Sequence, residues 1–355
     1  MYRLVSGVVC FFCLLAGTAF AGTILVRQDG SGNYTTITAA VNAANNGDLI
    51  RVGAGTYSEY VTITKSVGLE SESGAAVTIL DGLDAQRIFV VDGAVSVDIR
   101  GFTFTRARSD EGSALLVWHQ PTVLVDDCVF DSNYATGSNA VAVRHTGSSL
   151  RLRNCRFAHN QAAVHSAALS SNMGASLVVE NCQFIENQAS GHAAMNTISS
   201  HVEVTGCLFL RNVGSVGALT IGSACTGFVS GNTFHGNSGY SATVSLEAGV
   251  AFQDNIVSGD LTGRGLVTTA GTSHTCNLYY GNALGACNQS LGAGETDEDP
   301  LYCEPLADIF LVCSGSPAVA NGQNCGARGA YGVGCTCDPI PGETTSWGTV
   351  KGYFR

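Results

Sequence analysis

Hydrophobic and polar positions between residues 124 and 237 follow one phrase that returns five times. Each copy opens on alternating or β-branched apolar residues, and none contains the run of about ten residues that a repeated helix requires. Three columns align between the copies, at spacings of 27, 27, 25 and 25 residues. The columns are Cys128, Cys155, Cys182, Cys207 and Asn232, then Phe130, Phe157, Phe184, Phe209 and Phe234, then Asn133, Asn160, Asn187, Asn212 and Asn237.

A fixed period of this length indicates one structural unit stacked on copies of itself. Short strands that recur without hairpin turns must stack in parallel, about 4.8 Å apart. We therefore predict an all-β fold, a parallel β-helix of about ten coils. The phenylalanines should stack inside it, and the cysteines should be mainly free, buried thiols. The asparagines should lie at bends, where asparagine can tolerate left-handed backbone geometry, and each amide can hydrogen-bond to the next asparagine in the stack.

The N-terminal part predicts the start of this solenoid. Residues 35–44 carry apolar side chains at helical spacing, and a short helix there would cover the open first coil. The remaining apolar segments predict short strands at Thr23–Gln28, Leu49–Val52, Tyr60–Ile63, Val67–Leu69, Val77–Leu80, Ile88–Val91 and Val95–Ile99.

Two phrases, DGSGNYTTITAAVNAANNGDLIRVGAGTYSEYVTITK and VTILDG, resemble the opening of right-handed parallel β-helix proteins of the pectin lyase-like superfamily. Pectin methylesterases share the DGSG opening and the GTY-E phrase, which is Gly55-Thr56-Tyr57 with Glu59 here. The resemblance covers roughly Thr23–Cys335 and implies the fold. The catalytic motifs of pectin methylesterases, of the types QDTL, DFIFG and GRPW, are absent, and the nearest fragment, Phe252–Asn255, falls on the Cys/Asn column.

Composition and charge narrow the setting. Residues 1–21 resemble a signal peptide, with Arg3, an apolar core and Ala19-Phe20-Ala21 before the cleavage point. No later apolar run is long enough to span a membrane, so we expect a secreted or cell-surface protein, and a monomer. The net charge of −11 argues against nucleic acid as a partner.

The domain organisation follows from these segments. Residues 22–275 form the β-helix, residues 276–337 a Cys-rich coil and cap, and residues 338–355 a linker and short tail. Loops of similar size suggest the disulfides Cys276–Cys287, Cys303–Cys313 and Cys325–Cys335, although spacing alone leaves the connectivity open.

Candidate chemistry lies outside the repeated columns. Counted from the Asn column, Glu111, His165 and His192 fall in or near one column, with the histidines on adjacent coils. With Arg144 they are the candidates for acid–base catalysis or metal binding. Trp118, His119 and His145 at the following bend could form a ledge that binds sugars or uronates. Asp297 and Asp299 are candidates for Ca²⁺, and no other cofactor is expected.

The absent catalytic motifs favour a non-catalytic protein that binds glycans or surfaces. The alternative is a polysaccharide lyase or hydrolase that acts on a uronate-containing polymer at the lateral face of the solenoid. A role in metal handling is the weakest interpretation, because the chain has only three Met and scattered His. Fold alone does not separate these functions.

Overall fold

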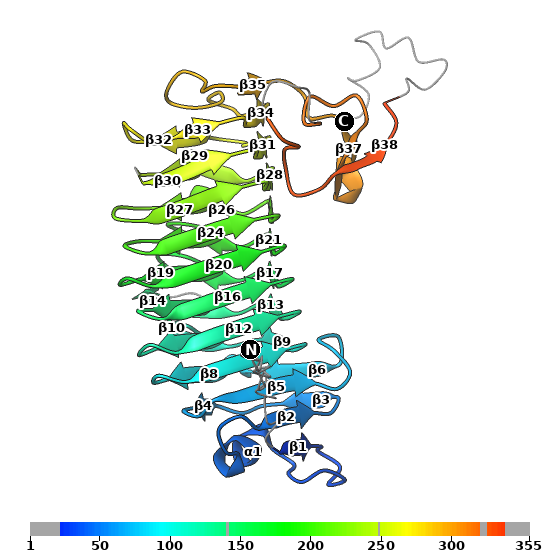
Figure 1. The fold of residues 1–355 in the computed structure, drawn as a ribbon. Coiled ribbons are helices and arrows are strands. Elements are labelled where there is room, and N and C mark those ends of the chain that lie inside the picture. The colour runs from blue at the N-terminus through cyan, green and yellow to red at the C-terminus, as the bar shows by residue number, and fades with distance from the viewer. Residues whose placement is uncertain (1–21, 140–141, 248, 320–324, 338–355) are drawn as a thin grey trace, which may run out of the picture.

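The computed structural model describes residues 22–139, 142–247, 249–319 and 325–337, and shows a solenoid of stacked parallel strands with a small C-terminal sheet at its side (Figure 1). The proposed signal peptide and the C-terminal tail lie outside the described residues. Three long sheets, called A, B and C here, run along the solenoid, and a fourth, sheet D, has three strands. No helix in the described ranges is long and apolar enough to cross a membrane.

Sheets A and B each contain eleven strands in chain order. Sheet A consists of β1 (Thr23–Val26), β2 (Leu49–Val52), β5 (Val67–Ser71), β8 (Ser96–Arg100), β12 (Thr122–Asp126), β16 (Ser149–Arg153), β20 (Ser176–Glu180), β24 (His201–Thr205), β27 (Thr226–Ser230), β30 (Val250–Gln253) and β33 (His274–Thr275). Sheet B consists of β3 (Gly55–Tyr57), β6 (Thr78–Asp81), β9 (Thr103–Thr105), β13 (Val129–Asp131), β17 (Arg156–Ala158), β21 (Gln183–Ile185), β25 (Leu208–Leu210), β28 (Thr233–His235), β31 (Ile256–Ser258), β34 (Leu278–Tyr280) and β35 (Thr296–Asp297). The prediction of about ten coils agrees with this stack.

Sheet C has two columns of strands that merge into long strands further along the solenoid. The first column is β10 (Arg108–Glu111), β14 (Tyr134–Asn139), β18 (Gln161–Ala162) and β22 (Gln188–Ala189). The second column is β4 (Val61–Ile63), β7 (Phe89–Asp92), β11 (Leu115–Trp118), β15 (Val143–Thr146), β19 (Leu169–Asn172) and β23 (Met195–Thr197). Both columns pair with β26 (Val213–Ile221), which is followed by β29 (Ser238–Leu246) and β32 (Arg264–Thr268).

The repeated columns fill the interior as predicted. Phenylalanine rings on successive coils stack nearly parallel, and the centroids of Phe157 and Phe184 are 4.9 Å apart. Each ladder asparagine is buried, and from Asn160 to Asn237 its side-chain oxygen accepts hydrogen bonds from the asparagine of the preceding coil, for example Asn160 Nδ2 to Asn187 Oδ1 at 2.9 Å. These asparagines do not themselves adopt the left-handed geometry that asparagine tolerates. The left-handed residue is the one before each column position, such as Glu186 with φ 54°.

The cysteine column does more than fill space. The Cys155 amide nitrogen lies 3.4 Å from Cys182 Sγ, and the Cys207 amide donates to Asn232 Oδ1 at 2.9 Å. The thiols therefore accept the same coil-to-coil hydrogen bond that asparagine accepts further along. Cys128, Cys155, Cys182 and Cys207 are all free and buried, as the sequence predicted.

The predicted N-terminal helix is α1 (Ile37–Ala43), and residues from the first coil fix both of its ends. Glu59 accepts hydrogen bonds from the amides of Ile37 and Thr38, at 2.9 and 2.8 Å. Lys65 Nζ donates to the carbonyl of Ala44 at 2.7 Å. A carboxylate at the N-terminus and an ammonium at the C-terminus both suit the helix dipole. The GTY-E phrase therefore carries the acid that positions the cap.

The Cys-rich segment folds back along the solenoid. Sheet D contains β36 (Tyr302–Glu304), β37 (Ile309–Cys313) and β38 (Val333–Cys335), with a 3-10 helix, η1 (Pro305–Ala307), between the first two. Phe310 packs on Leu208 and Leu210 of sheet B. Arg211 Nη1 pairs with Asp308 at 2.6 Å. We call residues 302–337 the lateral module, and it covers an apolar part of the outer face of sheet B.

The disulfides differ from the suggested pairs. They join Cys276 to Cys325, Cys303 to Cys335 and Cys313 to Cys337, and Cys287 is free. Spacing along the chain suggested small local loops. The bonds instead link segments that meet only because the module folds back, and Cys276–Cys325 fastens it to the last coils.

Candidate functional site

An open groove of about 520 Å³ lies on the outer face of sheet C. Residues from successive coils line it: Tyr134, Gln161, Ala162, Ala163, Gln188, Ala189, Ser190, Val213, Gly214 and Tyr240. Strand register places Tyr134 beside Gln161 and Gln161 beside Gln188. The groove thus runs along the solenoid axis. None of these lining residues is charged, which distinguishes the groove from a site for a polyanion.

Two tyrosines mark the ends of this groove. Tyr240, in β29, is 82% exposed. The Arg108 guanidinium carbon lies 5.0 Å from the centroid of the Tyr134 ring, a cation–π contact that restrains the ring. Aromatic faces with amides between them can stack on apolar faces of a ligand and hydrogen-bond to its hydroxyls. The arrangement is suited to binding, and its lining contains no carboxylate, thiol or imidazole.

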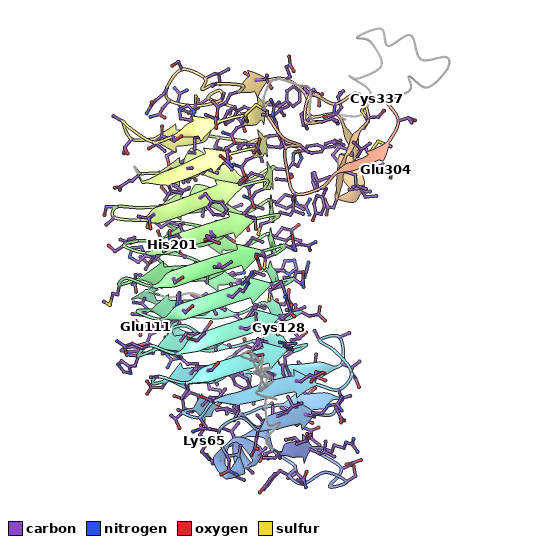
Figure 2. The ribbon with its side chains drawn as sticks, viewed as in Figure 1. Lys65, Glu111, Cys128, His201, Glu304 and Cys337 are labelled. Carbon is purple, nitrogen blue, oxygen red and sulfur yellow. A yellow bond between two sulfur atoms is a disulfide. The ribbon has the colours of Figure 1, made fainter. Side chains whose placement is uncertain are left out.

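Glu111 and Arg144 form an ion pair beside the groove, with Arg144 Nε 3.3 Å from Glu111 Oε1. Figure 2 shows Glu111 at one lateral edge of the solenoid, away from Glu304 in the lateral module. Arg144 is buried. The ion pair brings together two of the four catalytic candidates. The Glu111 carboxylate is thus engaged by a guanidinium and does not face the groove lining on its own.

His165 and His192 lie on adjacent coils, as predicted, but shifted by one residue. His192 pairs with Ser166, and its amide donates to the His165 carbonyl at 2.9 Å. The two histidines line a hollow of about 150 Å³, where Thr220 Oγ1 lies 2.7 Å from His192 Nδ1. Burial, with a smaller effect from the charge of His165, lowers the pKa of His192.

Glu111 is not a partner of these histidines. It ends β10, whereas His192 follows β22, three strands further along sheet C. At about 4.8 Å per strand, the separation along the axis is roughly 14 Å. Within the described ranges, no group of three or more His, Cys, Asp or Glu is arranged to hold a metal ion. Asp297 and Asp299 therefore form no such group with their described neighbours.

The predicted sugar-binding ledge contains two of its three residues. Trp118 and His119 line an open hollow of about 350 Å³ with Met173, and His119 Nδ1 lies 2.6 Å from Asp92 Oδ1. His145 is fully buried, because its alternation in β15 turns it into the solenoid. There its Nδ1 lies 3.1 Å from Ser171 Oγ. Burial lowers the pKa of His145 to about 4, so its assignment to the ledge is corrected.

The sequence reasoning missed the groove residues, although a signal for them existed. Tyr134, Gln161 and Gln188 each follow an asparagine of the interior ladder directly. The residue after an inward-facing position faces outward, so this column could have been identified as a surface column. Tyr240 does not stand in that column, and only the three-dimensional stack brings it to the groove.

Comparisons with known proteins agree with the fold. A family described as "Right handed beta helix region" matches residues 26–209 and 87–277. The pectate lyase Pel9A has a similar structure, with a TM-score of 0.53, 13% identity, and coverage of 89% of this chain and 98% of the other. A pectin methylesterase from Aspergillus niger has a TM-score of 0.42, 16% identity, and coverage of 82% and 94%. Identity this low supports the fold alone.

One sequence relative is similar over a short stretch. It is a probable pectinesterase/pectinesterase inhibitor from Arabidopsis thaliana, 54% identical over 50 residues. The match spans 12% of this chain and only 9% of the relative. The family match, in contrast, covers well over half of the chain. The protein therefore belongs to the right-handed β-helix family and has the pectin lyase-like architecture.

Proposed function

We propose that the protein is an exported, non-catalytic glycan-binding β-helix protein that holds an extended neutral polysaccharide in the groove on sheet C. The observation that carries this proposal is the lining of the groove. It spans several coils, has Tyr134 and Tyr240 at its ends, and contains amide and hydroxyl groups but no charged side chain. This uncharged lining favours a neutral glycan over a uronate-containing polymer.

The geometry of the groove supports an elongated ligand. Gln161 and Gln188 are exposed neighbours in adjacent strands, so their amides repeat along the axis at the strand spacing of about 4.8 Å. Each amide offers both a donor and an acceptor. A polymer that lies along the axis can form similar contacts with one coil after another, whereas a small ligand would use only one of them.

Hydrolysis is less well supported. It requires two carboxyl groups that flank the scissile bond. The groove lining contains none, and Glu111 beside it is paired with Arg144. The uronate lyase or hydrolase is therefore the alternative that the experiment must separate from binding.

Export is part of the proposal. The signal-peptide-like residues 1–21 and the three disulfides support an oxidising compartment outside the cytoplasm. The open hollow lined by Trp118, His119 and Met173 is a second aromatic surface that a glycan can contact.

Affinity electrophoresis and calorimetry with neutral polysaccharides (β-glucans, galactans and mannans) and with uronate polymers test the proposal. We expect a neutral polymer to bind, and the variant Tyr240→Ala to weaken that binding about tenfold, the loss expected for one aromatic stacking contact. Tyr60→Ala is the matched control. Tyr60 is also exposed, but it directly precedes β4 in the N-terminal part of the solenoid, away from the groove.

The same samples are assayed for cleavage, with and without Ca²⁺. Unchanged polymer length and no absorbance from unsaturated products support a binding protein. Unsaturated product from a uronate polymer that disappears in Arg144→Ala or His165→Ala would establish the lyase instead. Absence of binding to every neutral polymer would also overturn the proposal.

A further inference from the structure

A second concave site lies where the lateral module meets the solenoid. It has a volume of about 420 Å³, within the range of about 300–1,000 Å³ that is usual for small-molecule sites. The solenoid contributes His235, Ser258 and Tyr280, the segment leading into the module contributes Asp299, and the module itself contributes Tyr302. We call this the junction site. It borders sheet B, whereas the groove lies on sheet C.

The polar groups of the junction site are held in fixed positions. His235 Nδ1 lies 3.0 Å from Ser258 Oγ, and Ser258 Oγ lies 3.1 Å from the Tyr302 hydroxyl. Leu301 donates its amide to Asp299 Oδ1 at 2.8 Å, which fixes the carboxylate. Such preorganisation lowers the entropy cost of binding a ligand.

Tyr280 supplies an accessible aromatic surface. Its side chain belongs to β34 and is 43% exposed. The negative charge of Asp299, together with a hydrogen bond to it, raises the pKa of the Tyr280 phenol. The phenol therefore stays protonated and donates toward the carboxylate, which holds the ring beside the acid.

The charges of the site select against anions. Asp299 is the one carboxylate among the lining residues, and no lysine or arginine lines the site. Burial, and then the positive charge of Arg211, lower the pKa of His235, so the imidazole is neutral near neutral pH. Arg211 itself is engaged by Glu186 and Asp308. A ligand with a carboxylate would meet repulsion from Asp299 without a compensating cation.

We propose that the junction site binds a single neutral sugar residue, or the end of a neutral glycan, with its apolar face on Tyr280 and a hydroxyl donating to Asp299. The neutral His235, whose side chain is only partly buried, offers a further hydrogen bond to a hydroxyl group. The site needs both the last coils and the module. It is independent of the proposed polymer groove, since the two share no residue.

Ligand-observed NMR and calorimetry on the full disulfide-bonded chain test this site. The probes are the methyl glycosides of glucose, galactose and mannose, with glucuronate and galacturonate as charged counterparts. At least one neutral glycoside should bind saturably, and its charged counterpart should bind about tenfold more weakly, because one uncompensated charge contact costs of this order. Asp299→Asn should weaken neutral binding and reduce the discrimination against uronates.

The decisive variants separate the two sites. Tyr280→Ala should abolish glycoside binding, and Tyr280→Phe, which keeps the ring, should retain most of it. Tyr240→Ala should leave it unchanged while weakening polymer binding at the groove. Because Tyr280 is partly exposed, the variant should fold, and an unchanged disulfide content verifies this. Failure of all three neutral glycosides to bind, or binding that survives Tyr280→Ala, would overturn the proposal.

Discussion

Asn277 Nδ2 donates to Glu295 Oε1 at 2.6 Å, at the place where an interior ladder of amides ends. Earlier in this column each asparagine donates to the next one, as Asn255 Nδ2 does to Asn277 Oδ1 at 3.0 Å. Among the described residues no asparagine follows Asn277 in this column, and the buried carboxylate of Glu295 takes that place. Glu295 also accepts from the Gly292 amide at 2.7 Å and lies 2.9 Å from His274 Nδ1.

Replacing this carboxylate should loosen the end of the solenoid. Glu295→Ala removes one of the two acceptors of the buried Asn277 amide and the acceptor of the half-buried Gly292 amide, and we expect a loss of about 2–4 kcal/mol in unfolding free energy. Urea unfolding followed by circular dichroism measures it. Glu298→Ala removes the same charge from an exposed position nearby and should change stability little. Equal effects of the two substitutions would contradict the structural role of Glu295.

The second amide ladder predicts a similar dependence in the middle of the stack. Asn187 Oδ1 accepts from the amide nitrogen and from Nδ2 of Asn160, and Asn187 Nδ2 donates to the Phe157 carbonyl at 3.0 Å. Asn187→Ala should therefore lower the unfolding free energy by about 2–4 kcal/mol. Gln188→Ala, at the exposed next position, is the control for stability. If Asn187→Ala left the unfolding free energy unchanged, the ladder would not stabilise the fold.

His145 predicts a particular pH dependence. Its pKa falls from the usual 6.5 to about 4 because it is buried, so protonation favours the unfolded chain. Above pH 6.5 the neutral His145 makes its full contribution to the unfolding free energy. As the pH falls from 6.5 to about 4, the unfolding free energy decreases by roughly 3 kcal/mol in total. His145→Gln should flatten this part of the stability profile. Wild-type and variant profiles that stay parallel between pH 7 and pH 4 would contradict the prediction.

The cysteines predict a thiol count. From residue 22 onward the chain has twelve cysteines, six in disulfides and six free, the latter being Cys128, Cys155, Cys182, Cys207, Cys225 and Cys287. A thiol reagent should find six groups in denaturant without reductant. In the native protein only Cys287, the one free cysteine that is not buried, should react quickly. Fast reaction of more than one native thiol would show that the column is accessible.

The scaffold could be predicted from the sequence because its residues repeat in the interior. Phe184 must meet Phe209 whenever coils of this period stack, and the structure places their centroids 4.7 Å apart. The cap helix followed from local spacing. Its acid, Glu59, was recognised only as part of a family phrase, since a contact across some twenty residues cannot be read from helical periodicity.

The lateral surface was harder to predict, for reasons of register. The bend between Asn160 and Leu169 is one residue longer than the bend between Asn187 and Met195, and Leu169 pairs with Met195. Counting from the Asn column therefore placed His165 beside His192, whereas Ser166 is the residue that pairs with His192. A shift of one residue reverses the facing of a strand. The same uncertainty placed His145 on the surface.

The amide ladders also give the solenoid a direction. In each rung the donors belong to the earlier coil and the acceptor oxygen to the later one, as with Asn212 Nδ2 and Asn237 Oδ1. A nascent chain that leaves the ribosome N-terminus first thus always carries one coil whose amides still lack acceptors. Each new coil supplies the acceptor oxygens for the amides of the coil before it. Its own amides then lack acceptors until the next coil forms. The ladder that contains Asn277 ends at Glu295, whose carboxylate accepts this hydrogen bond and has no side-chain amide to donate to a later coil.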